Sequence, residues 1–121
     1  MIKIVVGGQI DKQELAKLIK EVGQDEVSVD VKSDLEAAMA MKAGDYDYYL
    51  GACNTGGGGA LAMAIALLGP ELTSTVSMPG SIKDESFMIE EIKKGKKAFG
   101  FTAQHAQQVV PVLVREFVKN K

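Results

Sequence analysis

The segment from Cys53 to Gly59 (CNTGGGG) is the part of this 121-residue sequence best suited to chemistry. A thiol near the N-terminus of a helix has a lowered pKa, and its thiolate acts as a base or a nucleophile at neutral pH. Asn54 and Thr55 add an amide and a hydroxyl that can polarise oxygen atoms of a ligand. A second interpretation stays open, because a single cysteine is often a small hydrophobic residue at the end of a buried strand.

Four consecutive glycines follow, and an apolar run begins directly after them. The first turn of a helix has unpaired N–H groups and a partial positive charge, so glycines there let an anion reach the backbone. A tight turn needs only one or two glycines. Each further glycine costs backbone entropy when it becomes ordered, so turn geometry alone does not explain four of them. We therefore expect a phosphate or a carboxylate to bind at Gly56, Gly57, Gly58 and Gly59.

Strand and helix patterns alternate along the whole chain. Apolar or β-branched runs at residues 1–6, 26–31, 48–52, 72–78 and 97–102 predict five strands, each followed by a helical segment. Ser33 with Glu36, and Asp11 with Glu14, are typical of capped helix starts. No linker divides the sequence, so residues 1–121 are expected to form one domain.

This alternation predicts an α/β fold with a five-stranded parallel sheet between two layers of helices. We expect the Rossmann-like, flavodoxin-like strand order 2-1-3-4-5. Ligands of such sheets bind at the carboxyl ends of the strands, where the chain reverses its winding direction, here between the first and third strands. Gly7, Gly8 and Gln9, which follow the first strand, would then lie beside the glycine loop and contribute to ligand binding.

Three further residues at the same edge are candidates for ligand binding. Ser81 and Lys83 would add a hydroxyl and a cation, and His105 would act as a general acid or contact a phosphate. A structural interpretation also fits each of them: Pro-Gly before Ser81 makes a turn, and His105 is a solvated residue in a first helical turn that Thr102 caps.

Several classes of function are excluded by composition. One histidine, one cysteine and no clustered carboxylates exclude a permanent metal site, and no cofactor is expected. A formal charge of -2 and the absence of tryptophan argue against nucleic acid binding. The longest apolar run, residues 60–68, is about half of what a membrane span requires. A single cysteine and no signal-like N-terminus favour the cytoplasm.

The helix predicted over residues 60–68 has no polar stripe. Leu61, Ile65 and Leu68 lie on one side of it and alanines on the other. A surface helix of a monomer normally has a polar face, so this helix must be covered on both sides. We expect a homodimer with this helix in the interface.

The sequence carries two resemblances. Segments 34–39, 47–49, 51–56 and 98–100 resemble the YhfU family of uncharacterised bacterial proteins, over nearly the whole chain. Locally, Cys53-x-Thr55-Gly56-x-Gly58 is similar to the C-G-T-G-x-G loop of ribose-5-phosphate isomerase type B and of galactose-6-phosphate isomerase subunits. That similarity implies that the glycines bind substrate, that Cys53 transfers a proton between adjacent carbons and that Thr55 assists ring opening. Asn54 replaces the usual glycine.

The leading hypothesis is a protein that binds a phosphorylated or carboxylated metabolite between its first and third loops. As an enzyme it would be a sugar-phosphate isomerase, with Cys53 as acid and base. The alternative is a non-catalytic ligand-binding or regulatory subunit of a larger metabolic or transport assembly.

Overall fold

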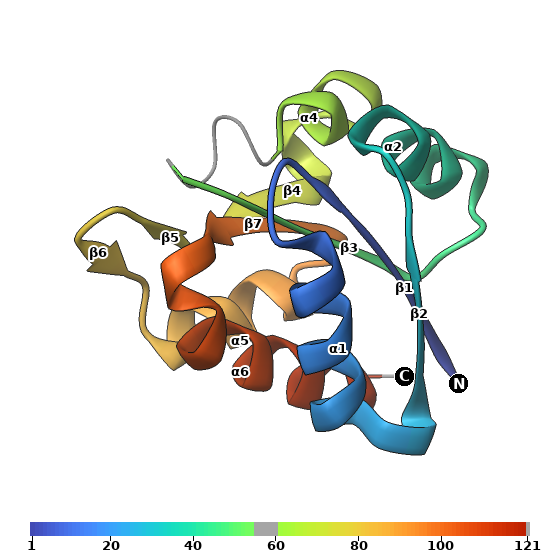
Figure 1. The fold of residues 1–121 in the computed structure, drawn as a ribbon. Coiled ribbons are helices and arrows are strands. Elements are labelled where there is room, and N and C mark those ends of the chain that lie inside the picture. Colours follow the sequence, from blue (N-terminus) through green and yellow to red (C-terminus); the bar gives the residue numbers. More distant parts are fainter. Residues whose placement is uncertain (55–60, 121) are drawn as a thin grey trace.

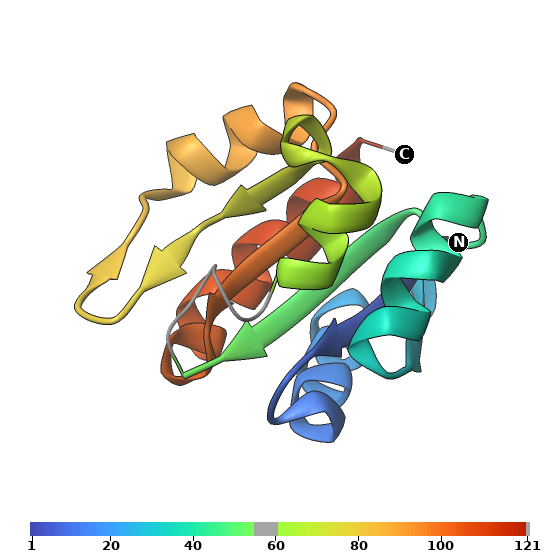
Figure 2. The ribbon, with the colours of Figure 1, turned by 90° about the horizontal axis from the view of Figure 1, so that it is seen from above.

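The computed structural model describes residues 1–54 and 61–120. A five-stranded parallel sheet lies between two layers of helices (Figures 1 and 2). The fold class expected from the sequence is confirmed. The strands of this sheet are Ile2–Gly8 (β1), Val27–Val31 (β2), Tyr48–Cys53 (β3), Thr73–Thr75 (β4) and Ala98–Thr102 (β7).

Helices α1, α5 and α6 cover one face of the sheet, and α2 and α4 cover the other (Figure 1). The larger cluster of buried apolar side chains lies under the first of these layers and includes Phe99, Leu113 and Phe117. The helices are Lys12–Gly23 (α1), Asp34–Ala43 (α2), Ala62–Leu68 (α4), Glu85–Lys93 (α5) and Ala106–Lys119 (α6), with short 3-10 turns at Gln24–Glu26 (η1), Pro70–Leu72 (η2) and Ala103–His105 (η3).

The strand order is β2-β1-β3-β7-β4, so the last two strands exchange the places predicted for them. Every residue of β7 (AFGFT) is buried, whereas β4 is the short polar segment TST. A central strand is covered on both faces and favours the apolar sequence, while an edge position tolerates a short polar strand. Because the chain runs back from β4 to β7, a right-handed connection places α5 in the same layer as α1 and α6.

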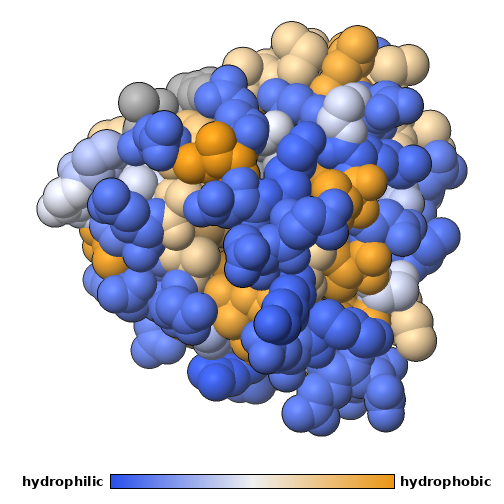
Figure 3. All heavy atoms as spheres, in the orientation of Figure 1, coloured by the Kyte–Doolittle hydropathy of each residue, from blue (hydrophilic) through white to orange (hydrophobic). Residues whose placement is uncertain are grey.

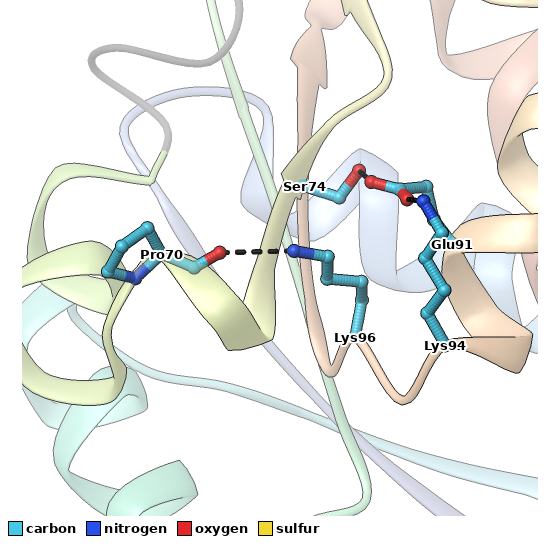
Figure 4. Close-up of polar contacts among 5 residues, drawn as sticks. All are labelled: Pro70, Ser74, Glu91, Lys94 and Lys96. Carbon is cyan, nitrogen blue, oxygen red and sulfur yellow. Dashed lines mark hydrogen bonds and ion pairs between the residues drawn. The ribbon is translucent and has the colours of Figure 1, made fainter.

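Polar contacts fasten the edge strand β4 to its surroundings (Figure 4). The Ser74 hydroxyl donates to Glu91 Oε1 at 2.7 Å, and Lys94 Nζ donates to Glu91 Oε2 at 3.2 Å. Burial raises the pKa of Glu91, but these hydrogen bonds outweigh it and the pKa is lowered. Lys96 Nζ donates to the Pro70 carbonyl at 3.1 Å. The ionised Glu91 therefore holds the edge strand against α5.

The fourth predicted strand, residues 72–78, is interrupted at Val76. Ser77–Met78 (β5) pairs antiparallel with Ser81–Ile82 (β6), and this hairpin extends beyond β4 (Figure 2). The Val76 carbonyl accepts the N–H of Lys83 at 2.9 Å. In a continued parallel ladder the Val76 carbonyl would accept the N–H of Thr102. Instead, the Thr102 N–H donates to Ser77 Oγ at 2.9 Å. The Ser77 side chain thus replaces a ladder carbonyl.

The two predicted helix caps have different outcomes. The Glu36 N–H donates to Ser33 Oγ at 3.1 Å, which confirms the cap of α2. The cap predicted at Asp11 is wrong, because this residue has a φ of 56° and its side chain makes no capping hydrogen bond. Capping side chains require an extended backbone, which the left-handed conformation of Asp11 does not provide.

Candidate functional site

The carboxyl edge of the sheet has an unusual arrangement around β3. After β3 the chain passes to the α2 and α4 layer, whereas after β1 and β7 it passes to α1 and α6 in the other layer (Figure 1). The winding direction therefore reverses on both sides of β3. Ligands of open α/β sheets bind at such reversals. The second reversal, between β3 and β7, follows from the strand exchange and was missed from the sequence.

A groove of about 350 Å³ lies between α1 and α6 at the end of β3. Leu15, Ala52 and other apolar residues form its floor, and Asp11, Glu14 and Gln104 contribute to its polar walls. Carboxylates and carboxamides of this kind accept hydrogen bonds from hydroxyl groups. The volume is within the range of sites for small molecules.

The loop after β1 is closed by internal contacts. The Gly8 N–H donates to the Tyr49 hydroxyl at 2.9 Å, and the Gln9 N–H donates to the Ala52 carbonyl at 3.0 Å. A Cβ atom on Gly7 would lie 2.5 Å from Tyr49 Cε2. Gly7 and Gly8 thus have a packing role, and the N–H groups of Gly8 and Gln9 are engaged within the protein. The side chain of Gln9 is exposed.

Tyr49 closes the loop from the middle of the sheet. Its side chain is fully buried, and its hydroxyl donates to Asp34 Oδ1 at 2.5 Å while accepting the Gly8 N–H. Burial, together with the Asp34 carboxylate, raises the pKa of Tyr49 far above its ordinary value of 10.0. Sequence reasoning missed this residue. The sequence did contain a signal for it: a tyrosine in a strand predicted to be buried, next to a strand that ends in two glycines, which leave room for the ring.

Cys53 ends β3 and is buried, with 1% of its surface exposed. Strand alternation places its side chain on the same face of the sheet as Tyr49. Asn54 follows and is exposed. The remaining residues that the sequence assigned to this loop lie outside the described residues: Thr55, Gly56, Gly57, Gly58 and Gly59.

Thr102 pairs with Cys53 in the register of β3 and β7. It is 2% exposed, and its Oγ1 atom has no hydrogen-bond partner in the described part of the chain. Its expected role as a helix cap is wrong, because its side chain makes no capping hydrogen bond and the residue before α6 is His105.

His105 and Ser77 form a pair beside Thr102. Ser77 Oγ lies 3.0 Å from His105 Nδ1 and also accepts the Thr102 N–H. The hairpin therefore contacts the end of β7 through Ser77, which sequence reasoning did not select. Lys83 Nζ lies 5.3 Å from the centre of the Phe87 ring, so its ammonium group faces α5. Ser81 is exposed on β6.

Comparison with known proteins places the chain in a family. A family model described as a protein of unknown function, DUF2620, matches residues 2–117. The chain belongs to the DUF2620 family. It is 38% identical over 114 residues to uncharacterized protein YhfU of Escherichia coli (strain K12) and of Shigella flexneri, a match that covers 94% of this chain and 97% of each relative. This confirms the resemblance to the YhfU family. No solved structure matches the chain significantly.

The side chains at the ends of β3 and β7 in this DUF2620 member carry groups that can form hydrogen bonds or exchange protons. They are the thiol of Cys53 on β3, the hydroxyls of Thr102 on β7 and Ser77 on β5, and the imidazole of His105 in the turn before α6. Among residues 1–54 and 61–120, no three His, Cys, Asp or Glu side chains are grouped to hold a metal ion. In the same ranges no helix has both the length and the hydropathy of a membrane span.

Proposed function

We propose that this protein binds a phosphorylated or carboxylated metabolite at the carboxyl ends of β3 and β7. The observation that carries the proposal is the reversal of the chain on both sides of β3. It leaves a groove of about 350 Å³ at the end of the strand that also carries Cys53 and Asn54. Small-molecule sites of open α/β sheets occupy this position.

The two sides of the β3 end favour different parts of a ligand. Asp11, Glu14 and Glu21 outnumber Lys17 along the groove, so its walls repel an anion and accept the hydroxyl groups of a neutral part. The glycine-rich sequence after Asn54 is suited to the anionic part, because N–H groups without neighbouring side chains bind phosphate. A sugar phosphate combines both parts in one molecule.

As an enzyme, the protein would interconvert an aldose and a ketose phosphate. The Cys53 thiolate would remove a proton from the carbon beside the carbonyl and return a proton to the adjacent carbon. The hydroxyl proton would move between two oxygen atoms that Asn54 and Thr55 polarise. This mechanism rests on the similarity of residues 53–58 to the loop of ribose-5-phosphate isomerase type B.

Binding without catalysis is the second candidate function, in a regulatory subunit or the ligand-binding subunit of a larger assembly. The observation that favours it is the burial of the Cys53 side chain. A covered thiol has little access to a substrate carbon.

Ribose 5-phosphate at millimolar concentration tests both candidates. We expect it to raise the melting temperature of the wild type, while ribose and inorganic phosphate give smaller rises. A Cys53→Ala variant should keep this rise, and the enzyme hypothesis further requires that the variant lose turnover of the sugar phosphate. A rise with no turnover by the wild type would favour the binding subunit. Absence of any rise with ribose 5-phosphate or a panel of other phosphorylated and carboxylated metabolites would refute the proposed ligand class.

We also propose that two copies associate through the outer faces of α2 and α4. Leu35, Met39 and Ile65 are 50%, 55% and 39% exposed, and α4 contains no charged residue. Apolar atoms gather over α4 at the top of Figure 3. Apolar surface of this kind on adjacent helices is typical of an interface between subunits.

Sedimentation velocity at micromolar concentration tests the homodimer. Met39→Lys places a charge in the proposed interface and should yield monomers, whereas Met78→Lys, at a methionine of similar exposure on the hairpin, should leave the dimer intact. A wild-type monomer, or equal effects of the two substitutions, would contradict the proposal.

A further inference from the structure

The Thr102 side chain is the exception in an otherwise satisfied part of the sheet. Its backbone N–H donates to Ser77 Oγ, and its residue is 2% exposed, yet its hydroxyl has no partner among the described residues. Buried hydroxyls in native proteins are nearly always hydrogen-bonded, because burial without a partner is unfavourable. The Thr102 hydroxyl is therefore a cost to stability as long as no partner accepts or donates a hydrogen bond there.

A threonine on the adjacent strand shows the ordinary case. Thr73 on β4 is also buried, at 8% exposed, and its Oγ1 donates to the Pro70 carbonyl at 3.4 Å. Thr102 instead ends β7, opposite Cys53 in the register and next to the Ser77 and His105 pair. Its hydroxyl therefore lies at the carboxyl edge of the sheet, where the chain turns from β7 toward α6.

We infer that Thr102 contacts the ligand through its hydroxyl, which binds an oxygen atom of the metabolite beside Cys53. This inference rests on the proposed function and adds a specificity-determining residue to it. The hydroxyl can donate and accept a hydrogen bond, so it favours a hydroxyl or carbonyl oxygen over a methyl group at that position of the ligand. An analogue without this oxygen would leave the hydroxyl unpartnered and bind more weakly.

Thr102→Val tests the inference, since valine keeps the shape and removes the hydroxyl. We expect the ligand-free variant to melt at the same temperature as the wild type or a few degrees above it, because an unpartnered buried group is lost. Its affinity for ribose 5-phosphate should fall about tenfold or more. Thr102→Ser retains the hydroxyl and should bind ribose 5-phosphate nearly as well as the wild type.

Thr73→Val is the matched control. Its hydroxyl has a partner, so this variant should melt below the wild type and bind ribose 5-phosphate with unchanged affinity. A Thr102→Val protein that melts well below the wild type, or that binds ribose 5-phosphate as tightly, would overturn the inference. If ribose 5-phosphate does not stabilise the wild type, the sugar-phosphate ligand is wrong, and the affinity of Thr102→Val is then measured with the metabolite of the panel that does stabilise it, where unchanged affinity overturns the inference.

Discussion

The loop after β1 and the end of β7 lie near the same strand, β3, and differ in how their polar groups are satisfied. In the first, Tyr49 and Ala52 accept the N–H groups of Gly8 and Gln9. In the second, the Thr102 hydroxyl has no partner within the described residues. The comparison teaches that glycines at a strand end need not mark a ligand site, because close packing requires them as well. A buried polar group without a partner is the more direct sign.

The largest effect is expected from Gly8→Ala in the closed loop. Gly8 has a φ of 78°, and a Cβ atom there would lie 2.7 Å from the Ala52 backbone nitrogen, which cannot move aside. We expect a loss of about 4 kcal/mol in the free energy of unfolding, measured with urea. Gly44→Ala is the control, since its φ is 84° but nothing lies within 4 Å of the new atom, and it should lose about 1 kcal/mol. Equal losses would refute the packing role.

Tyr49→Phe should have the next largest effect. It removes the hydroxyl that joins the Gly8 N–H to Asp34, and both groups are at least partly buried. We expect a loss of about 2 kcal/mol in the free energy of unfolding. Tyr46→Phe, which removes a hydroxyl bonded to Asp30 at an exposed site, should lose less than about 1 kcal/mol. If Tyr46→Phe costs as much, the buried link is not what closes the loop.

The pH dependence of stability gives a separate test of Tyr49. Burial and Asp34 raise its pKa above the ordinary value of 10.0, so the folded state keeps the proton that the unfolded state loses above this pH. Stability from this group is complete below pH 10 and falls as the pH rises further, by about 1.4 kcal/mol per pH unit.

Urea unfolding between pH 9 and pH 11 should therefore show a steeper decline for the wild type than for Tyr49→Phe. Some decline should remain in the variant, because an Asp30 hydrogen bond raises the pKa of Tyr46 to about 12. Identical slopes for the two proteins would contradict a neutral, buried Tyr49.

Ser77→Ala should destabilise the protein less than Gly8→Ala and Tyr49→Phe. It leaves the Thr102 N–H without its acceptor and removes a hydrogen-bond partner of His105, for a loss of about 1 kcal/mol. If the end of β7 serves a ligand, this variant should lose proportionally more of the stabilisation by ribose 5-phosphate than Tyr49→Phe does. If Tyr49→Phe loses more of this stabilisation than Ser77→Ala in thermal-shift measurements, the ligand binds at the loop after β1 and not at the end of β7.

Local signals in the sequence predicted most elements correctly. The Ser33 cap depends on residues a few positions apart and is confirmed. The hairpin was missed, although Pro79-Gly80 between two short runs favours a type II turn, and Gly80 has the positive φ of 77° that this turn needs. The Asp11 cap failed because its pattern says nothing about the backbone conformation that neighbouring segments impose.

The sequence by itself determined the alternation of strands and helices, the parallel sheet and the membership of the DUF2620 family, because periodicity and identity are properties of the chain alone. Only the tertiary structure decided the order of β7 and β4, the closure of the first loop and the missing partner of Thr102. Tyr49 reaches Gly8 across 41 positions and Ser77 reaches Thr102 across 25, and contacts between such distant segments depend on which strands become neighbours in the sheet.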